Sequence, residues 1–134
     1  MIALDTSVVV AAFATWHEAH ERVGEVVAGG AALPAQVAIE SFSVLTRLPP
    51  PQQARPDIVG EWLSEQFPDP WLSLSAEACR GVLEHLAESG IGGGAVYDAV
   101  IAATALEHRA TLVTRDRRAT RVYDLMGVEV RFLS

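Results

Sequence analysis

Four acidic side chains lie in strongly apolar stretches of this sequence. Charged groups beside buried surface are costly unless they are paired or bind a metal ion, and most of these four positions have no basic residue next to them. Carboxylate oxygens select hard divalent cations, and Mg²⁺ or Mn²⁺ held by a few carboxylates suits phosphate substrates. We therefore expect a metal site for phosphate chemistry made from Asp5, Glu40, Asp98 and Asp116.

The elements that would position these residues alternate between strands and helices. Short apolar runs predict strands at 2–4, 31–34, 71–74, 111–114 and 128–133. Helical spacing of apolar residues predicts helices at 8–13, 17–27, 35–48, 56–67, 96–107 and 117–126, with another beginning after Ser75. Such alternation indicates an α/β fold with a parallel sheet covered by helices on both faces.

In a sheet of this kind, binding sites lie beyond the carboxyl ends of the strands. Asp5 and Asp116 each follow a predicted strand, and Glu40 and Asp98 lie near the start of helices that leave the same edge. The sequence thus predicts that all four carboxylates converge on one crevice. Each also has a purely structural interpretation, since Asp5, Asp98 or Asp116 can cap a helix and Glu40 can be a solvated helix position.

The charge of the chain limits how it can meet a nucleic acid. A net charge of -7 argues against broad, non-specific binding to phosphate backbones. All 10 basic residues are arginines, however, and five of them form a local basic rim around Asp116: Arg109, Arg115, Arg117, Arg118 and Arg121. The planar guanidinium fork suits phosphate, and the absence of lysine excludes any mechanism that needs an amine.

Length and hydropathy favour one cytoplasmic domain over residues 1–134. The longest apolar run, 8–14, is far shorter than the roughly 20 residues of a membrane span, and no basic segment precedes the first apolar stretch. Cys79 is the sole cysteine, which excludes an internal disulfide. His17 and His20 are spaced one residue too closely for a His-Glu-x-x-His zinc motif.

Four short motifs follow one another in order along the chain. They are Asp5-Thr6-Ser7, Glu40 before Val44-Leu45-Thr46-Arg47-Leu48, Tyr97-Asp98-Ala99-Val100-Ile101-Ala102-Ala103, and Leu112-Val113-Thr114-Arg115-Asp116. Together they resemble the PIN domain, and they look closest to the VapC ribonuclease toxins of bacterial toxin and antitoxin modules. The resemblance implies a three-layer α/β/α sandwich with a mainly parallel central sheet. It also implies a Mg²⁺- or Mn²⁺-dependent endoribonuclease, a VapB-type antitoxin as partner, and a homodimer.

The resemblance also assigns expected roles to individual residues. The family's acidic quartet, which is catalytic and binds metal, matches Asp5, Glu40, Asp98 and Asp116, and its supporting hydroxyl matches Thr114. The expected substrate-binding residues are Thr6, Arg115, Arg117 and Arg118. The three arginines can grip RNA phosphates or simply form a solvated helix terminus.

Other protein classes also place an aspartate after a first parallel strand. Receiver domains and haloacid-dehalogenase-type phosphotransferases both use a lysine near the phosphoryl group, and this chain has none. A catalytically degenerate PIN-fold module that only binds an antitoxin or RNA remains as the alternative. We expect an antitoxin segment to dock on the helices at 35–48 and 56–67, where Trp62 and Leu63 supply apolar surface.

Overall fold

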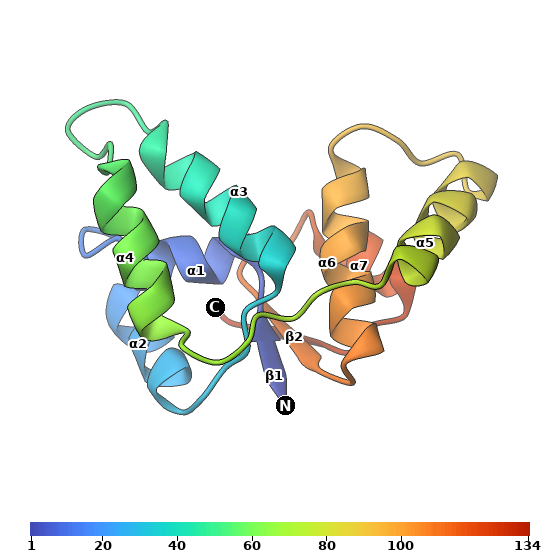
Figure 1. Ribbon diagram of the computed structural model, residues 1–134, viewed down its shortest axis with the longest axis horizontal. Coiled ribbons are helices and arrows are strands. Elements are labelled where there is room, and N and C mark those ends of the chain that lie inside the picture. Colours follow the sequence, from blue (N-terminus) through green and yellow to red (C-terminus); the bar gives the residue numbers. More distant parts are fainter.

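The computed structural model describes residues 1–134, and it contains alternating strands and helices (Figure 1). In chain order the elements are β1 (Ile2–Leu4), α1 (Thr6–Phe13), α2 (His20–Ala28), α3 (Ala35–Thr46), α4 (Pro56–Gln66), α5 (Ala76–Glu88), α6 (Ala95–Glu107), β2 (Thr111–Thr114), α7 (Thr120–Met126) and β3 (Val130–Phe132). No helix is both long and apolar enough to cross a membrane.

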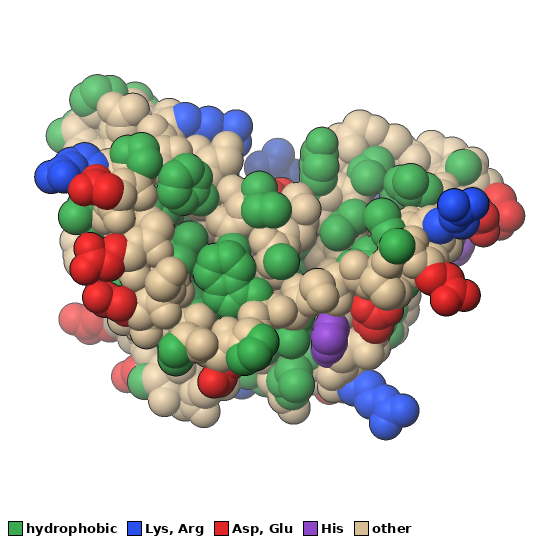
Figure 2. Space-filling view, in the orientation of Figure 1, with side chains coloured by type: hydrophobic (Ala, Val, Ile, Leu, Met, Phe, Trp, Pro, Cys, Tyr) green, Lys and Arg blue, Asp and Glu red, His purple; other side chains and the backbone are tan.

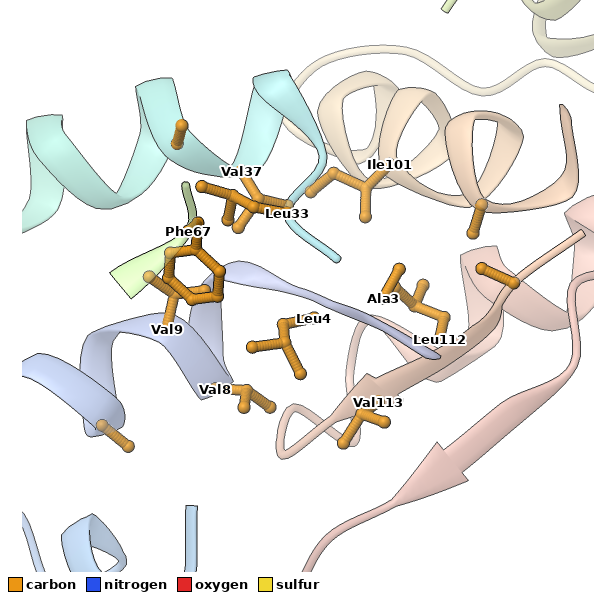
Figure 3. Close-up of a cluster of buried hydrophobic side chains, with 14 of the residues drawn as sticks. Ala3, Leu4, Val8, Val9, Leu33, Val37, Phe67, Ile101, Leu112 and Val113 are labelled. Atoms are coloured by element: carbon orange, nitrogen blue, oxygen red, sulfur yellow. The ribbon is translucent and has the colours of Figure 1, made fainter. Parts of the chain in front are cut away.

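The three strands form a parallel sheet in the order β1-β2-β3. Leu4 is in register with Val113, and Ala3 with Leu112. Because side chains alternate across a sheet, these two pairs point to opposite faces. Figure 3 shows Leu4 and Val113 on the side of Val8 from α1, and Ala3 and Leu112 on the side of α3 and α6. Helices thus cover both faces, and the predicted α/β sandwich with a parallel sheet is confirmed.

Two of the five predicted strands, 31–34 and 71–74, are present only as isolated β-bridges. Ala32 pairs with Ala3, and Leu72 pairs with Pro34, each in the parallel sense. Pro34 has no N–H to donate, and α3 begins at the next residue, so the segment 31–34 has no length over which to continue a ladder. Both segments therefore run parallel to the strands of the sheet but do not form strands of their own.

Three predicted helix starts differ from the structure by two or three residues. Helix α1 begins at Thr6 because Asp5 already acts as its N-cap, accepting a hydrogen bond from the Val8 N–H. Helix α2 begins at His20 instead of 17, since the ring of His17 accepts the Ala19 N–H and holds a turn there. Helix α7 begins at Thr120 because a turn closed by the Asp116 side chain occupies the preceding residues.

The prediction that Trp62 and Leu63 form an exposed docking surface is wrong. Leu63 is only 3% exposed and belongs to the main core. Trp62 packs edge-on against both Phe13 and Phe67. The apolar face of α4 is thus used to hold α4 on the rest of the molecule. Figure 1 shows α3 and α4 side by side as one projecting group, with α5 and α6 forming a second group across from them.

Candidate active site

The four predicted carboxylates line one cavity of about 410 Å³ at the carboxyl end of the sheet. Its lining contains Asp5 from the end of β1, Glu40 from α3, Asp98 from the first turn of α6 and Asp116 from the loop after β2. The surface is hollowed between the α3 and α6 sides of the molecule (Figure 2). The structure therefore brings together residues that are up to 111 positions apart, as the parallel topology predicted.

Asp5 is the most buried of the four, at 2% exposed. Its Oδ1 accepts hydrogen bonds from the Ser7 hydroxyl at 2.6 Å and from the Val8 N–H at 3.3 Å. Its Oδ2 accepts from the Thr114 hydroxyl and from the Tyr123 hydroxyl, the latter at 2.9 Å. Burial raises the pKa of Asp5, and these donors oppose that rise by stabilising the ionised carboxylate.

Two of the hydroxyls around Asp5 have their own orientation fixed by backbone amides. The Arg115 N–H donates to Ser7 Oγ at 2.9 Å, and the Asp116 N–H donates to Thr114 Oγ1 at 3.0 Å. A hydroxyl that accepts from an amide has its one proton free to donate elsewhere. Ser7 and Thr114 therefore both direct their protons at Asp5, and they tie the loop after β2 to the end of β1.

Glu40 and Asp98 are half-buried and repel each other. Burial raises the pKa of Asp98 to about 6, and the nearby charges of Asp116 and Asp5 add to the rise. Burial and the charge of Asp98 likewise raise the pKa of Glu40. The Gln36 and Thr6 side chains oppose this rise in the pKa of Glu40, but no donor reaches its buried Oε2 in full hydrogen-bonding geometry. This part of the cavity holds more negative charge than its polar surroundings compensate.

Asp116 is exposed and has a structural role as well as its place in the cavity. Its Oδ1 accepts from the Arg118 N–H at 2.9 Å and from the Ala119 N–H at 3.4 Å, which closes the turn before α7. The capping interpretation is thus correct for Asp5 and for Asp116 in addition to their position at the site. One Asp116 oxygen, Oδ2, has no bond to the turn and is free to meet a ligand.

The arginines near Asp116 do not all face the cavity. Arg115 lines it, and its Nε is buried without a partner. The guanidinium of Arg117 instead lies 4.0 Å from the centre of the Phe132 ring, in a cation–π contact on β3. Arg118 is exposed and is not part of the lining, whereas Thr6 is. Of the expected substrate-binding residues, the structure therefore places Thr6 and Arg115 at the site.

A second cavity of about 400 Å³ adjoins the first, because Glu40 lines both. Its remaining lining comes mainly from α3, including Arg47, with Tyr97 from α6 opposite. Each cavity thus has one arginine in its lining, Arg115 in the first and Arg47 in the second.

Three polar lining residues were not expected from the sequence: Ser7, His17 and Tyr123. Ser7 follows Asp5 by two positions, and a serine there is a recognisable capping signal. His17 belongs to the helix predicted at 17–27, but it lies in the turn before α2. Tyr123 had no signal at all, since its approach to Asp5 depends on how α7 packs.

The chemistry of this donor set suits a divalent cation. It consists of carboxylate oxygens with one unsatisfied buried oxygen on Glu40, and such oxygens favour Mg²⁺ or Mn²⁺ over softer metals. No three acidic, His or Cys side chains lie close enough to share one ion as they stand. Both Asp5 oxygens accept hydrogen bonds from neighbouring donors, which fix the orientation of this carboxylate.

Comparison with known proteins agrees with this geometry. The chain is 46% identical to Ribonuclease VapC40 of Mycobacterium tuberculosis over 134 residues, covering 100% of both chains. It is 42% identical to Ribonuclease VapC27 of the same species over 130 residues, covering 96% of this chain and 94% of the relative.

Among solved structures, the fold is similar to that of VapBC2 from Rickettsia felis bound to a DNA fragment from their promoter. The TM-score is 0.67 at 18% identity, with 100% of each chain covered. Residues 2–125 match the PIN domain family. A match of this extent, with relatives of this identity over the full length, makes the chain a member of the PIN-domain family.

Proposed function

We propose that this protein is a metal-dependent endoribonuclease that acts as the toxin of a toxin and antitoxin pair. The observation that carries the proposal is the cavity in which Asp5, Glu40, Asp98 and Asp116 come together from four separate elements. Two relatives that match over nearly the full length are named ribonucleases, which supports RNA as the substrate. Residues 1–134 act as one domain in this proposal, since each half of the chain supplies two of the carboxylates.

The residues that would hold Mg²⁺ or Mn²⁺ are the four carboxylates. Asp5, Asp98 and Glu40 would bind one ion, and Asp116 a second ion or its water. A bound divalent cation supplies Lewis acidity at the scissile phosphate and lowers the pKa of its water. The raised pKa values of Asp98 and Glu40 support this assignment, because a cation would remove the repulsion that raises them.

Other residues of the chain bind and orient. Thr114 holds Asp5 through its hydrogen bond to Oδ2, and Thr6 lies in the lining beside it. Arg115 has a buried, unpartnered Nε in the cavity and can donate to an RNA phosphate, with Arg47 doing the same in the adjoining cavity. These two arginines give a protein of net charge -7 positively charged groups for a polyanion at the site itself.

The partner in this proposal is a VapB-type antitoxin. The names VapC and VapBC of similar proteins support it. Ile39 and Phe42 on α3 and Ile58 on α4 are exposed, and they offer apolar surface on these two helices in place of the half-buried Trp62 and the buried Leu63. We further propose a homodimer and a cytoplasmic location, where the RNA substrates are. Copurification with the product of the adjacent reading frame would test the pairing, and sedimentation would test the dimer.

The activity is tested with a circular RNA, which has no ends and therefore reports only endonucleolytic cleavage. Wild type should cleave it with Mn²⁺ and not with EDTA. Asp98→Asn should lose the activity by at least about 100-fold, because loss of even a partner that orients a metal ligand typically costs about 10–100-fold. Asp69→Asn is the matched control, because Asp69 is an exposed aspartate outside the site. A wild type that binds RNA without cleaving any would favour the degenerate, binding-only module instead.

A further inference from the structure

Tyr123 is a buried polar group that the proposed chemistry does not yet use. It lies on α7, is 1% exposed, and is separated from Asp5 by 118 positions in sequence. Its hydroxyl donates to Asp5 Oδ2 at 2.9 Å. Burying a hydroxyl costs free energy unless it is bonded, so this contact fixes the tyrosine and the carboxylate together.

The phenol O–H of Tyr123 is the donor in this hydrogen bond, and Asp5 Oδ2 is the acceptor. A carboxylate oxygen has two lone pairs, so Oδ2 can accept from both the Thr114 and the Tyr123 hydroxyls.

Thr114 and Tyr123 reach the same Asp5 oxygen from two different elements. Thr114 ends β2, and its hydroxyl is fixed by the Asp116 N–H. Tyr123 approaches from α7. Two donors from separate elements prevent the Asp5 side chain from rotating about its Cα–Cβ bond more effectively than one donor can. The Ser7 and Val8 donors fix the other oxygen in the same way.

We propose that Tyr123 is a positioning residue that holds Asp5 in the orientation needed to bind a divalent metal ion. This inference rests on the proposed metal-dependent function and adds a residue outside the acidic quartet. Donors that orient a metal ligand typically contribute about 10–100-fold to metal affinity or activity. Because Thr114 still donates to the same oxygen, loss of the Tyr123 hydroxyl should weaken metal binding by about 10-fold, the lower end of that range.

The test is a calorimetric titration of the full chain with Mn²⁺ alone, without RNA. Tyr123→Phe should raise the Kd for Mn²⁺ about 10-fold. Ser64→Ala is the control for loss of one hydroxyl, since Ser64 is exposed on α4 and lines neither cavity of the site. Its Kd should equal that of wild type. An unchanged or lower Kd for Tyr123→Phe overturns the proposal.

A second variant separates positioning from packing. Tyr123→Leu removes both the ring and the hydroxyl, whereas Tyr123→Phe keeps the ring. If the hydroxyl positions Asp5, both variants lose Mn²⁺ affinity to a similar extent, while only the leucine variant has a strongly lowered Tm. Normal affinity in the phenylalanine variant with weak affinity in the leucine variant would show a packing role and overturn the proposal. All titrations are made well below the lowest Tm.

The wild-type titration distinguishes the failure of this inference from failure of the proposed function. A wild type that binds no Mn²⁺ refutes the metal-dependent function and the inference with it. A wild type that binds Mn²⁺ and cleaves RNA, with a phenylalanine variant that binds it equally well, refutes only the positioning role of Tyr123.

Discussion

Asp98→Asn should make the metal-free protein more stable at pH 7 while removing its activity. Asp98 is half-buried near Asp5 and Asp116, and these surroundings raise its pKa from 3.8 to about 6. At pH 7 its carboxylate is ionised in both the folded and the unfolded chain, and the folded chain carries the cost of the buried, repelled charge. Asparagine has nearly the same shape without the charge.

The size of the effect follows from the two pKa values. Their difference, at about 1.36 kcal/mol per pH unit, corresponds to about 3 kcal/mol. Because the side chain is only half-buried, solvent screening reduces this to about 1–2 kcal/mol. The free energy of unfolding of the variant should therefore exceed that of wild type by about 1–2 kcal/mol at pH 7 in EDTA.

The dependence on pH provides a second measurement. Between the unfolded pKa of 3.8 and the folded pKa of about 6, the folded chain binds more protons, so stability falls as pH rises through this range. The contribution of protonated Asp98 is present near pH 4 and lost above about 6. Wild type should thus lose more stability than Asp98→Asn between these pH values. Glu40, whose pKa is also raised, keeps part of the dependence in both proteins.

The assay is urea unfolding in EDTA at several pH values, followed by circular dichroism. Asp69→Asn controls for the removal of one negative charge from a chain of net charge -7, and its stability should stay within about 0.5 kcal/mol of wild type. If Asp98→Asn is equally stable at pH 7 or less stable, the carboxylates do not repel one another as the geometry implies. Our account of why this site favours a cation would then be refuted.

Three further changes test other parts of the structure. Thr114→Val removes a buried donor to Asp5 and leaves the Asp116 N–H without its acceptor. It should therefore lower the free energy of unfolding, measured in urea, by about 1–3 kcal/mol. Gly127→Ala should cost about 1 kcal/mol, measured by thermal unfolding, because Gly127 ends α7 at φ 78°. Arg115→Ala should raise the KM for RNA about tenfold or more, the value of a charge-assisted hydrogen bond, whereas Arg117→Ala should leave it nearly unchanged.

Each of these has a clear contrary result. Full stability in Thr114→Val would mean that Asp5 does not need its hydroxyl partner. An alanine at 127 with unchanged Tm would show that the turn after α7 relaxes without strain. Equal effects of the two arginine substitutions would indicate that RNA runs along the outer surface near β3 and not through the cavity.

Much of the fold was predictable because local sequence patterns determine most of its helices and strands. The apolar run at Ile2–Leu4 is too short for a helix and is followed by capping residues, and the uniformly apolar 96–107 segment indicates a helix buried on several sides. Strand and helix alternation then implies parallel pairing. These features depend on neighbours a few positions apart, so they are visible in one sequence.

The boundaries were less predictable where a side chain bonds to the backbone. The ring of His17 and the carboxylate of Asp116 each hold a turn where helical spacing predicted a helix. The segments 31–34 and 71–74 contain residues suited to strands, yet they make only isolated bridges, two in the first segment and one in the second. In these places a few competing hydrogen bonds decide the outcome, and hydrophobic periodicity does not report them.

The sequence by itself determined that the chain carries four costly carboxylates, no lysine, and strands whose carboxyl ends must lie at one edge. Only the tertiary structure decided that Asp5 accepts hydrogen bonds from Thr114 and Tyr123, and that Arg117 makes a cation–π contact with Phe132. The register of β1 on β2 places Leu4 beside Val113, and the residues after them therefore meet. The packing of α7 then places the Tyr123 hydroxyl within hydrogen-bonding distance of Asp5. Contacts across more than 100 positions arise from register and packing together, and no local pattern in the sequence encodes them.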